Sequence, residues 1–202
     1  MNKEIKNVVV YASASPDVDE IYYKTATELA NIIVKEGFGI VYGGSRRGLM
    51  YACAGNVQNC GGRVVGVMPQ KFVDLGFANP QDCTEFYVTK GMRERKAKLD
   101  ELSDAVIAIS GGFGTLEEIS EMIVQKILGY NNKPIVFLNT NHFYDNLFEF
   151  FEQLIFERFA QTKVSYYYYL AQSPEEVIGY LKTYVPNELP KTVDDIYVKG
   201  NA

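Results

Sequence analysis

Asp104-Ala-Val-Ile-Ala-Ile109, followed by Ser110-Gly-Gly-Phe-Gly-Thr-Leu-Glu-Glu118, is the stretch of this chain that decides its fold. The first part is a short apolar run typical of a buried strand, and a helical pattern from Leu116 to Leu128 follows the glycines. Three glycines in four positions let the backbone turn sharply and aim successive N–H groups at one point. The helix adds the positive end of its dipole, so this junction predicts a phosphate site.

The helix start also carries polar side chains suited to chemistry. Thr115 would add a hydroxyl donor, and Glu118 would place a carboxylate one turn into the helix. A phosphate site beside a carboxylate indicates a reaction on a phosphorylated small molecule. The same pattern also suits a purely structural turn whose Glu stabilises the helix dipole. Two features upstream favour the functional interpretation.

The rest of the chain alternates short β-branched runs with longer helical patterns. Strands are expected at 7–11, 39–42, 63–68, 85–88, 104–109, 134–138 and within 165–170, and helices at 19–36, 47–59, 91–102, 116–128, 143–159 and 174–184. Such alternation predicts an α/β fold with right-handed crossovers, in which a mostly parallel sheet carries helices on both faces in three layers.

Three less regular segments complete this assignment. Residues 70–82 are expected to form a surface loop, and Tyr166–Tyr169 a half-buried strand. The segment from Pro186 onwards holds two prolines and few large apolar residues. We therefore expect a single domain at 1–185 and a peripheral C-terminal tail at 186–202.

Composition excludes several classes of partner. A net charge of −5 argues against general binding to nucleic acid polymers or anionic membranes. No apolar run reaches the length of a membrane span, and the N-terminal residues lack a secretory pattern, so we expect a cytoplasmic protein. Three cysteines without a C-x-x-C pair and a single histidine, His142, predict no metal site.

The first upstream feature is the position of the small-residue turns. Ser13-Ala-Ser15 follows the first expected strand, Gly43-Gly-Ser45 the second, and Gly111–Gly114 the central one. In parallel sheets, ligands bind beyond the carboxyl ends of the strands. The three turns are therefore expected to converge at one edge of the sheet.

The second feature is a run of positive charge, Gly91-Met-Arg-Glu-Arg-Lys-Ala-Lys98. Most such runs are solvated helix faces. Here Arg95 and Lys98 lie three residues apart and are expected to share a face, and the run directly precedes the central strand. A guanidinium at that place would reach a phosphate with fixed, forked geometry.

Three motifs together resemble a known family. Tyr42-Gly-Gly-Ser-Arg-Arg-Gly-Leu-Met50, Met92-Arg-Glu-Arg-Lys96 and Ser110–Glu118 are similar to Y-G-G-G-x-x-G-L-M, M-H-x-R-K and P-G-G-x-G-T-x-x-E. These are signatures of the LOG ("lonely guy") family of cytokinin riboside 5′-monophosphate phosphoribohydrolases, which is often labelled lysine decarboxylase. The resemblance covers roughly residues 7 to 183.

The resemblance implies a Rossmann-like sandwich and a homodimer or an assembly of dimers. It implies hydrolysis of the N-glycosidic bond of a nucleoside 5′-monophosphate, AMP or an N6-substituted AMP, to free base and ribose 5-phosphate, without a cofactor. Arg95 and Glu118 match the catalytic pair. The residues expected to bind substrate are Ser13, Gly43, Gly44, Met92, Lys96, Gly111, Gly112, Phe113, Gly114 and Thr115.

Several positions depart from the family pattern. Ser110 replaces the Pro before the glycines, Ser45 a glycine, and Arg93 the His of M-H-x-R-K. Val124 and Gln125 stand where the family usually has Thr-Trp. These changes bear on the base and the subunit contact more than on the type of reaction.

Two other functions compete with hydrolysis. A nucleotide sensor of the same superfamily would bind without cleaving, but would not need both Arg95 and Glu118. A pyridoxal-phosphate decarboxylase could also use a glycine-rich phosphate site, although no motif selects a Schiff-base lysine. G-x-x-x-x-G-K-[ST] is absent from the sequence, and no G-x-G-x-x-G follows the first strand, which argues against nucleoside triphosphate hydrolysis and NAD binding.

Overall fold

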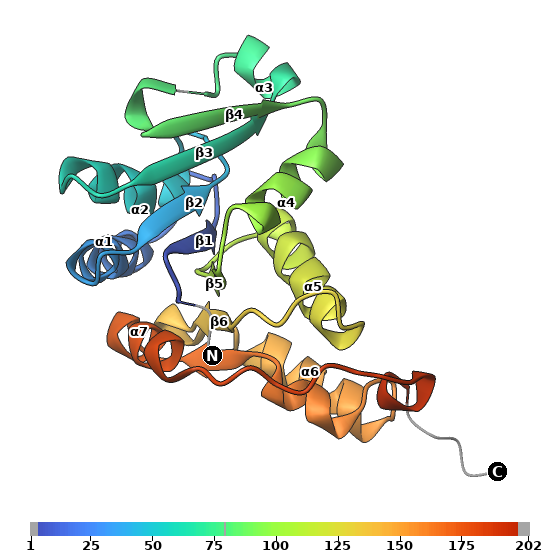
Figure 1. The fold of residues 1–202 in the computed structure, drawn as a ribbon. Coiled ribbons are helices and arrows are strands. Elements are labelled where there is room, and N and C mark those ends of the chain that lie inside the picture. The colour runs from blue at the N-terminus through green and yellow to red at the C-terminus, as the bar shows by residue number, and fades with distance from the viewer. Residues whose placement is uncertain (1–3, 79, 198–202) are drawn as a thin grey trace.

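A single parallel sheet forms the centre of the molecule. The computed structural model of the chain describes residues 4–78 and 80–197. The sheet has seven strands in the order β4-β3-β2-β1-β5-β6-β7, and every neighbouring pair is parallel (Figure 1). The strands are β1 (Asn7–Tyr11), β2 (Gly39–Tyr42), β3 (Val64–Pro69), β4 (Glu85–Thr89), β5 (Ala105–Ala108), β6 (Ile135–Leu138) and β7 (Tyr169–Ala171).

Helices cover both faces of the sheet, as the alternating pattern predicts. The α-helices are α1 (Glu20–Lys35), α2 (Gly48–Asn59), α3 (Gln70–Asp74), α4 (Met92–Glu101), α5 (Phe113–Ile127), α6 (Asp145–Phe156) and α7 (Pro174–Thr183), and the 3₁₀ turns are η1 (Pro80–Asp82), η2 (Thr140–His142), η3 (Thr162–Tyr166) and η4 (Val193–Asp195). One apolar core joins the sheet to α1, α2 and α7, and the other joins it to α4, α5 and α6 (Figure 1). The Rossmann-like three-layer fold is therefore confirmed.

Strand parity divides residues between the two cores. In β1, Val8 and Val10 face α1, α2 and α7, whereas Val9 and Tyr11 face α4, α5 and α6. Each strand of this kind is buried on both sides, which explains its continuous apolar run. Local signals set the ends of the helices, since Asp19 caps α1 by accepting from Ile21 N.

Residues 70–82 are not the irregular loop that the sequence predicts. They contain α3 and η1, and Ala78 forms an isolated antiparallel bridge with Ser45 beyond the end of β2. The short helix closes by hydrogen bonds from Leu75 N to Lys71 O and from Gly76 N to Val73 O. This segment therefore borders the carboxyl edge of the sheet.

The tyrosine cluster is also not a strand. Tyr166 ends η3, Tyr167 N bonds to Val164 O in a turn, and only Tyr169 belongs to β7. Tyr167 is buried in the core that contains α6. Side-chain burial thus sets the conformation here, and the β-propensity of tyrosine does not.

The C-terminal segment is tied to the domain as far as the structure describes it. Asn187 N donates to Asn132 Oδ1 at 3.2 Å, and Gln161 Nε2 donates to Asp194 O at 3.1 Å. Residues 198–202 of the expected tail lie outside the described residues.

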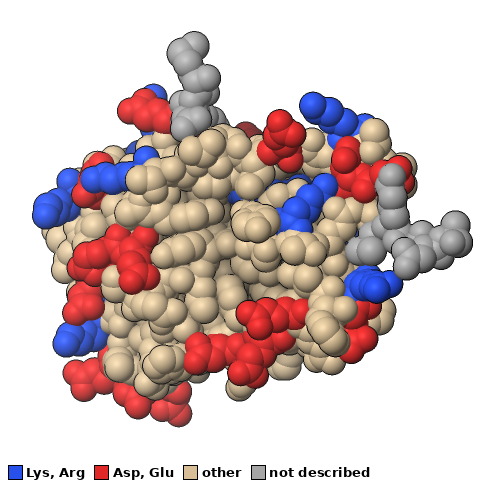
Figure 2. All heavy atoms as spheres, turned by 90° about the horizontal axis from the view of Figure 1, so that it is seen from below, with Lys and Arg blue, Asp and Glu red and all other residues tan. Residues whose placement is uncertain are grey.

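On the face seen from below, acidic and basic side chains are interspersed, with a broad uncharged area between them (Figure 2). Within residues 4–78 and 80–197, no helix has the length and apolar character needed to cross a membrane.

A buried lysine lies between α5 and the C-terminal segment. Lys126 is 1% exposed, and its ammonium donates to Lys133 O at 2.9 Å and to Tyr184 Oη at 2.6 Å. Its Nζ lies 4.8 Å from the centre of the Tyr184 ring and 5.7 Å from that of Tyr167. Burial lowers the pKa of Lys126 to about 7, since these dipoles and rings replace water incompletely.

We expect the free energy of unfolding to rise as the pH increases from 7 to 9. Above the folded pKa of about 7, the unfolded chain binds a proton at Lys126 that the folded chain lacks. Folding therefore releases a proton, and a higher pH favours the folded state. The expected gain is roughly 1 to 3 kcal/mol, measured by urea denaturation at each pH. Lys126→Met should abolish this slope, and Lys24→Met at an exposed position of α1 should retain it. A flat wild-type profile would contradict the assignment.

Candidate active site

Three turns meet at the carboxyl edge of the sheet. Ser13 N, after β1, donates to Ser110 O, after β5, at 3.2 Å. Ser13 O in turn accepts from Met50 N in the first turn of α2 at 3.2 Å. Because Gly43 and Gly44 directly follow β2 and lead into α2, all three small-residue turns border one site. Their predicted convergence is confirmed.

A buried ion pair lies behind these turns. Arg95 on α4 and Glu118 on α5 are 7% and 6% exposed, and Arg95 Nη1 lies 2.5 Å from Glu118 Oε1. Arg95 Nε also donates to Val67 O in β3 at 3.3 Å. The guanidinium is therefore held from two sides, and the two residues that the sequence predicts as a catalytic pair are in direct contact.

Gly43 leaves the space that the guanidinium occupies. A Cβ atom at this position would overlap Arg95 Nη2, and it would lie 2.8 Å from Met50 Sδ. The requirement at Gly43 is thus close approach of the backbone to a charged side chain. The glycine after β2 and the arginine of α4 belong to one arrangement, although 52 residues separate them in sequence.

Burial and neighbouring charges set the ionisation of Glu118. Burial raises the pKa of Glu118 above its ordinary value, and the charge and hydrogen bond of Arg95 oppose this rise. Glu117 adds to the rise and Lys96 reduces it. Tyr11, the last residue of β1, is buried on the same side, and its pKa is raised by burial and then by the charge of Glu118. Tyr11 is not among the site residues predicted from the sequence, although the alternation of side chains along β1 places it on the face covered by α4 and α5.

The start of α5 presents backbone N–H donors that have no acceptor among residues 4–78 and 80–197. The helix begins at Phe113, three residues before the predicted start, and its N-cap Gly112 makes no side-chain capping bond. The first N–H groups of a helix lack partners within that helix, and the first turn of α5 holds no acidic residue. A Cβ at Gly111 would overlap Thr115 Oγ1, so the turn packs directly onto that hydroxyl. This arrangement suits an anion.

The side chains around this helix start differ in exposure. Thr115 is 3% exposed, whereas Phe113 is 92% exposed and Met92, at the start of α4, is 47% exposed. Ser110, the residue that replaces the family proline, is 4% exposed. Within the part of the chain that the structure describes, Ser110 Oγ is a buried hydroxyl without a hydrogen-bond partner.

Lys96 and Lys98 of α4 form ion pairs outside the contact between Arg95 and Glu118. Lys96 forms ion pairs with Glu117 and Glu121 on α5. Lys98 pairs with Glu101 at 2.8 Å and lies 4.9 Å from the centre of the Tyr87 ring, so the expectation that it shares the face of Arg95 is wrong. A step of three residues on a helix turns 300°, and here the remaining 60° is enough to separate a buried from a solvated position.

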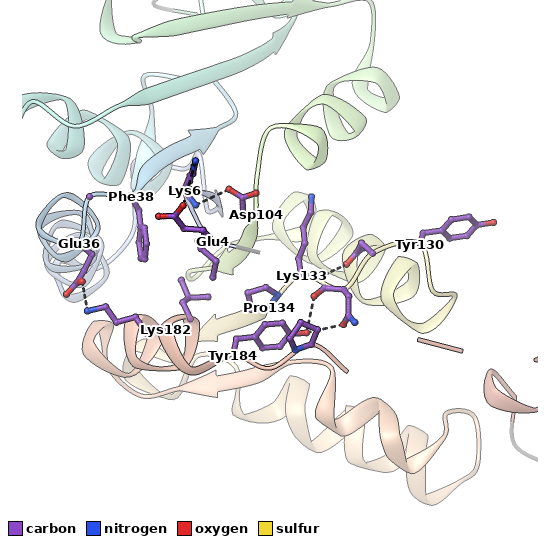
Figure 3. A pocket seen from close by; sticks show the side chains of 16 residues that line it. Glu4, Lys6, Glu36, Phe38, Asp104, Tyr130, Lys133, Pro134, Lys182 and Tyr184 are labelled. Atoms are coloured by element: carbon purple, nitrogen blue, oxygen red, sulfur yellow. Dashed lines mark hydrogen bonds and ion pairs between the residues drawn. The ribbon is translucent and has the colours of Figure 1, made fainter. Parts of the chain in front are cut away.

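A separate pocket of about 810 Å³ lies at the opposite edge of the sheet (Figure 3). Its walls come from the segments before β1, β2, β5 and β6 and from the end of α7. Lys182 pairs with Glu36 there, and Lys133 pairs with Asp100. Neither Arg95 nor Glu118 lines this pocket, so it is distinct from the candidate active site.

Comparison with known proteins gives consistent matches. A family model described as "possible lysine decarboxylase" matches residues 50–181. The cytokinin riboside 5′-monophosphate phosphoribohydrolase of Rhodococcoides fascians is 39% identical over 154 residues, or 76% of this chain and 78% of that protein. The Arabidopsis thaliana protein of that name is 32% identical over 186 residues, or 92% and 81% of the two chains.

The fold also matches solved structures. The molybdenum cofactor binding protein of Rippkaea orientalis superposes with a TM-score of 0.66 at 23% identity, covering 89% of this chain and 97% of that chain. At this identity the likeness concerns the fold alone.

We expect Gly43→Ala to destabilise the protein. The added methyl group must displace the Arg95 guanidinium or Met50, and overpacking of this kind costs about 1 to 3 kcal/mol. Gly179→Ala in α7 is the matched control, because a Cβ there meets nothing within 4 Å and alanine favours helix. Urea denaturation should show a loss for Gly43→Ala only. Equal stability of the two variants would contradict the close packing of Arg95 on Gly43.

Proposed function

Because the chain belongs to the LOG family of cytokinin riboside 5′-monophosphate phosphoribohydrolases, we propose that it hydrolyses the N-glycosidic bond of a nucleoside 5′-monophosphate. The products would be a free base and ribose 5-phosphate. The observation that carries the proposal is the buried Arg95–Glu118 pair next to the uncapped start of α5. A phosphate site one helical turn from a carboxylate fits a substrate with a phosphorylated sugar.

The 5′-phosphate would bind at the start of α5. The N–H groups of Gly112 to Thr115 are directed along the helix axis, and the helix dipole adds positive potential. The Ser13 turn contacts Ser110 and would form the neighbouring wall of this site. Binding energy from the phosphate would place the reacting C1′ atom near Glu118, so positioning would not depend on the base alone.

Glu118 would act at the sugar. As the bond between C1′ and the base nitrogen breaks, its electrons leave with the base and positive charge develops on the ribose. An ionised Glu118 stabilises that charge and accepts a proton from the attacking water, whose oxygen forms the new bond to C1′. The departing base takes up one proton from solvent and Glu118 releases one to solvent, so free base and ribose 5-phosphate leave and the carboxylate is restored. Arg95 opposes the rise that burial causes in the pKa of Glu118 and so favours the ionised carboxylate. Its own guanidinium stays charged and does not serve as the acid.

We propose AMP or an N6-substituted AMP as the substrate. Support comes from the relatives, which are named for cytokinin riboside 5′-monophosphates. Val124 is 49% exposed on α5, and it stands with Gln125 where the family usually has Thr-Trp. These positions lie away from the phosphate site, so the reaction type does not depend on them. We further propose that the enzyme acts in the cytoplasm on small nucleotides.

Release of base and ribose 5-phosphate from AMP, GMP, CMP and N6-isopentenyl-AMP tests this function. We expect turnover of the adenine nucleotides, and a loss of at least about 10²-fold in kcat for Glu118→Gln with nucleotide binding retained. Glu152→Gln on the exposed surface of α6 is the matched control and should leave turnover unchanged. Binding without turnover in the wild type would instead indicate a nucleotide sensor. Turnover by Glu118→Gln at the wild-type rate would refute the mechanism.

We also propose that the protein forms a homodimer. Phe113 and Val124 of α5 and Leu128 directly after it lie at helical spacing on the flank that also holds Glu117 and Glu121; the three apolar side chains are exposed by 92%, 49% and 40%, and Met92 of α4 is 47% exposed. Exposed apolar side chains that share one helix face indicate a protein contact. This face begins at the candidate active site, so a second copy would border the substrate.

Light scattering should therefore give a mass of about twice 22.8 kDa. Val124→Glu adds an unpaired carboxylate beside Glu117 and Glu121, whose charges Lys96 pairs, and should reduce the mass to that of one chain, because an unpaired charge in an interface is costly. Val193→Glu, at a 69% exposed position in η4, should leave the dimer intact. A monomeric wild type would rule out the dimer.

A further inference from the structure

Lys96 connects α4 to α5 beside the catalytic pair. It directly follows Arg95, its side chain is 16% exposed, and its ammonium forms ion pairs with Glu117 and Glu121 of α5. Glu117 and Glu121 are four residues apart, so they lie on one flank of the helix. Two consecutive residues of α4 thus bind three carboxylates within five residues of α5.

This arrangement fixes the rotation of α5. Glu118 follows Glu117 by one residue, so a turn of about 100° carries it from the exposed flank to the buried side. If Glu117 and Glu121 are held on Lys96, the same rotation directs Glu118 towards Arg95. A lysine ammonium has three donors, and here two of them are directed to carboxylates.

We propose that Lys96 is a positioning residue, which holds α5 against α4 so that Glu118 stays on Arg95, and that it does not bind the substrate phosphate. The inference rests on the hydrolase function proposed above and assigns Lys96 a different role from the one expected by family resemblance. Small displacements of a catalytic group are costly in rate, so such a residue affects the chemical step more than binding.

Lys96 also acts on the charge of Glu118. The charged and titratable groups that face Glu118 are Arg95 and Lys96 from α4, Glu117 from its own helix, and Tyr11 from β1. Without Lys96, Glu117 is no longer neutralised and the pKa of Glu118 rises further. Since the ionised carboxylate is the active form, the acid limb of the rate profile would then move to higher pH.

Three variants test the proposal with N6-isopentenyl-AMP. Lys96→Met should lower kcat by about tenfold or more, leave KM within about twofold and move the acid limb to higher pH. Lys96→Arg should restore most of kcat, because a guanidinium spans the same two carboxylates. Lys98→Met is the matched control on α4, since Lys98 pairs with Glu101 away from α5, and it should behave as wild type.

Two kinetic results would overturn the proposal. A rise in KM with unchanged kcat would place Lys96 on the substrate. Unchanged kcat, KM and pH profile in Lys96→Met would show that the bridge has no role in catalysis.

Failure of the hydrolase function would be recognised separately, because the wild type would then release no base from any nucleotide. In that case the position of Glu118 remains testable by carboxyl ¹³C NMR titration of wild type, Lys96→Met and Lys98→Met. A higher pKa of Glu118 in Lys96→Met only would support the bridge, and no difference among the three proteins would refute it.

Discussion

The buried ion pair between Arg95 and Glu118 is the interaction on which the site depends. Each ion would cost several kcal/mol to bury alone, so neither side chain could hold its place without the other. Their partners explain otherwise unrelated features: β3 offers Val67 O to Arg95, and the turn after β2 contains Gly43 because the guanidinium fills the space of a side chain. The sheet, by aligning strand ends, brings these distant segments to one edge.

The same topology gives this acidic chain a local arrangement of backbone groups that suits an anion. The net charge is −5, yet the start of α5 at this edge presents unpaired N–H groups and no acidic residue in its first turn. Helix N-termini in a parallel α/β fold point towards the carboxyl edge of the sheet, and helix C-termini point towards the other edge. The pocket at the amino edge accordingly lies among helix C-termini, which carry the negative end of the helix dipole. Two of its lysines are neutralised by ion pairs, Lys182 with Glu36 and Lys133 with Asp100.

Much of this architecture could be predicted from the sequence, because buried parallel strands leave continuous apolar runs and the glycine turns follow them directly. The errors arose where tertiary contacts decide local structure. The Tyr167 side chain is buried in the core beside α6, so the chain turns there, and α3 forms in a segment whose apolar residues show no clear helical period. The ion-pair partners of Arg95 and Lys96 also depend on tertiary packing and could not be read from the sequence. Motif resemblance predicted Glu118 as catalytic, but α4 offers four cations and α5 three carboxylates, and only the relative rotation of the packed helices selects the pairs. Lys126 left no signal, since a buried lysine and an exposed one look alike in a helical pattern.

Binding and chemistry at such a site share one electrostatic balance. A substrate phosphate at the start of α5 would add negative charge about one turn from Glu118 and favour its protonated form, in the same direction as burial. Arg95, supported by Lys96, opposes both effects. A stronger phosphate site without this support would bind the nucleotide more tightly but leave Glu118 protonated and unable to accept a proton from water. In the proposed mechanism, the cations of α4 would therefore prevent phosphate binding at α5 from suppressing Glu118, the proposed base.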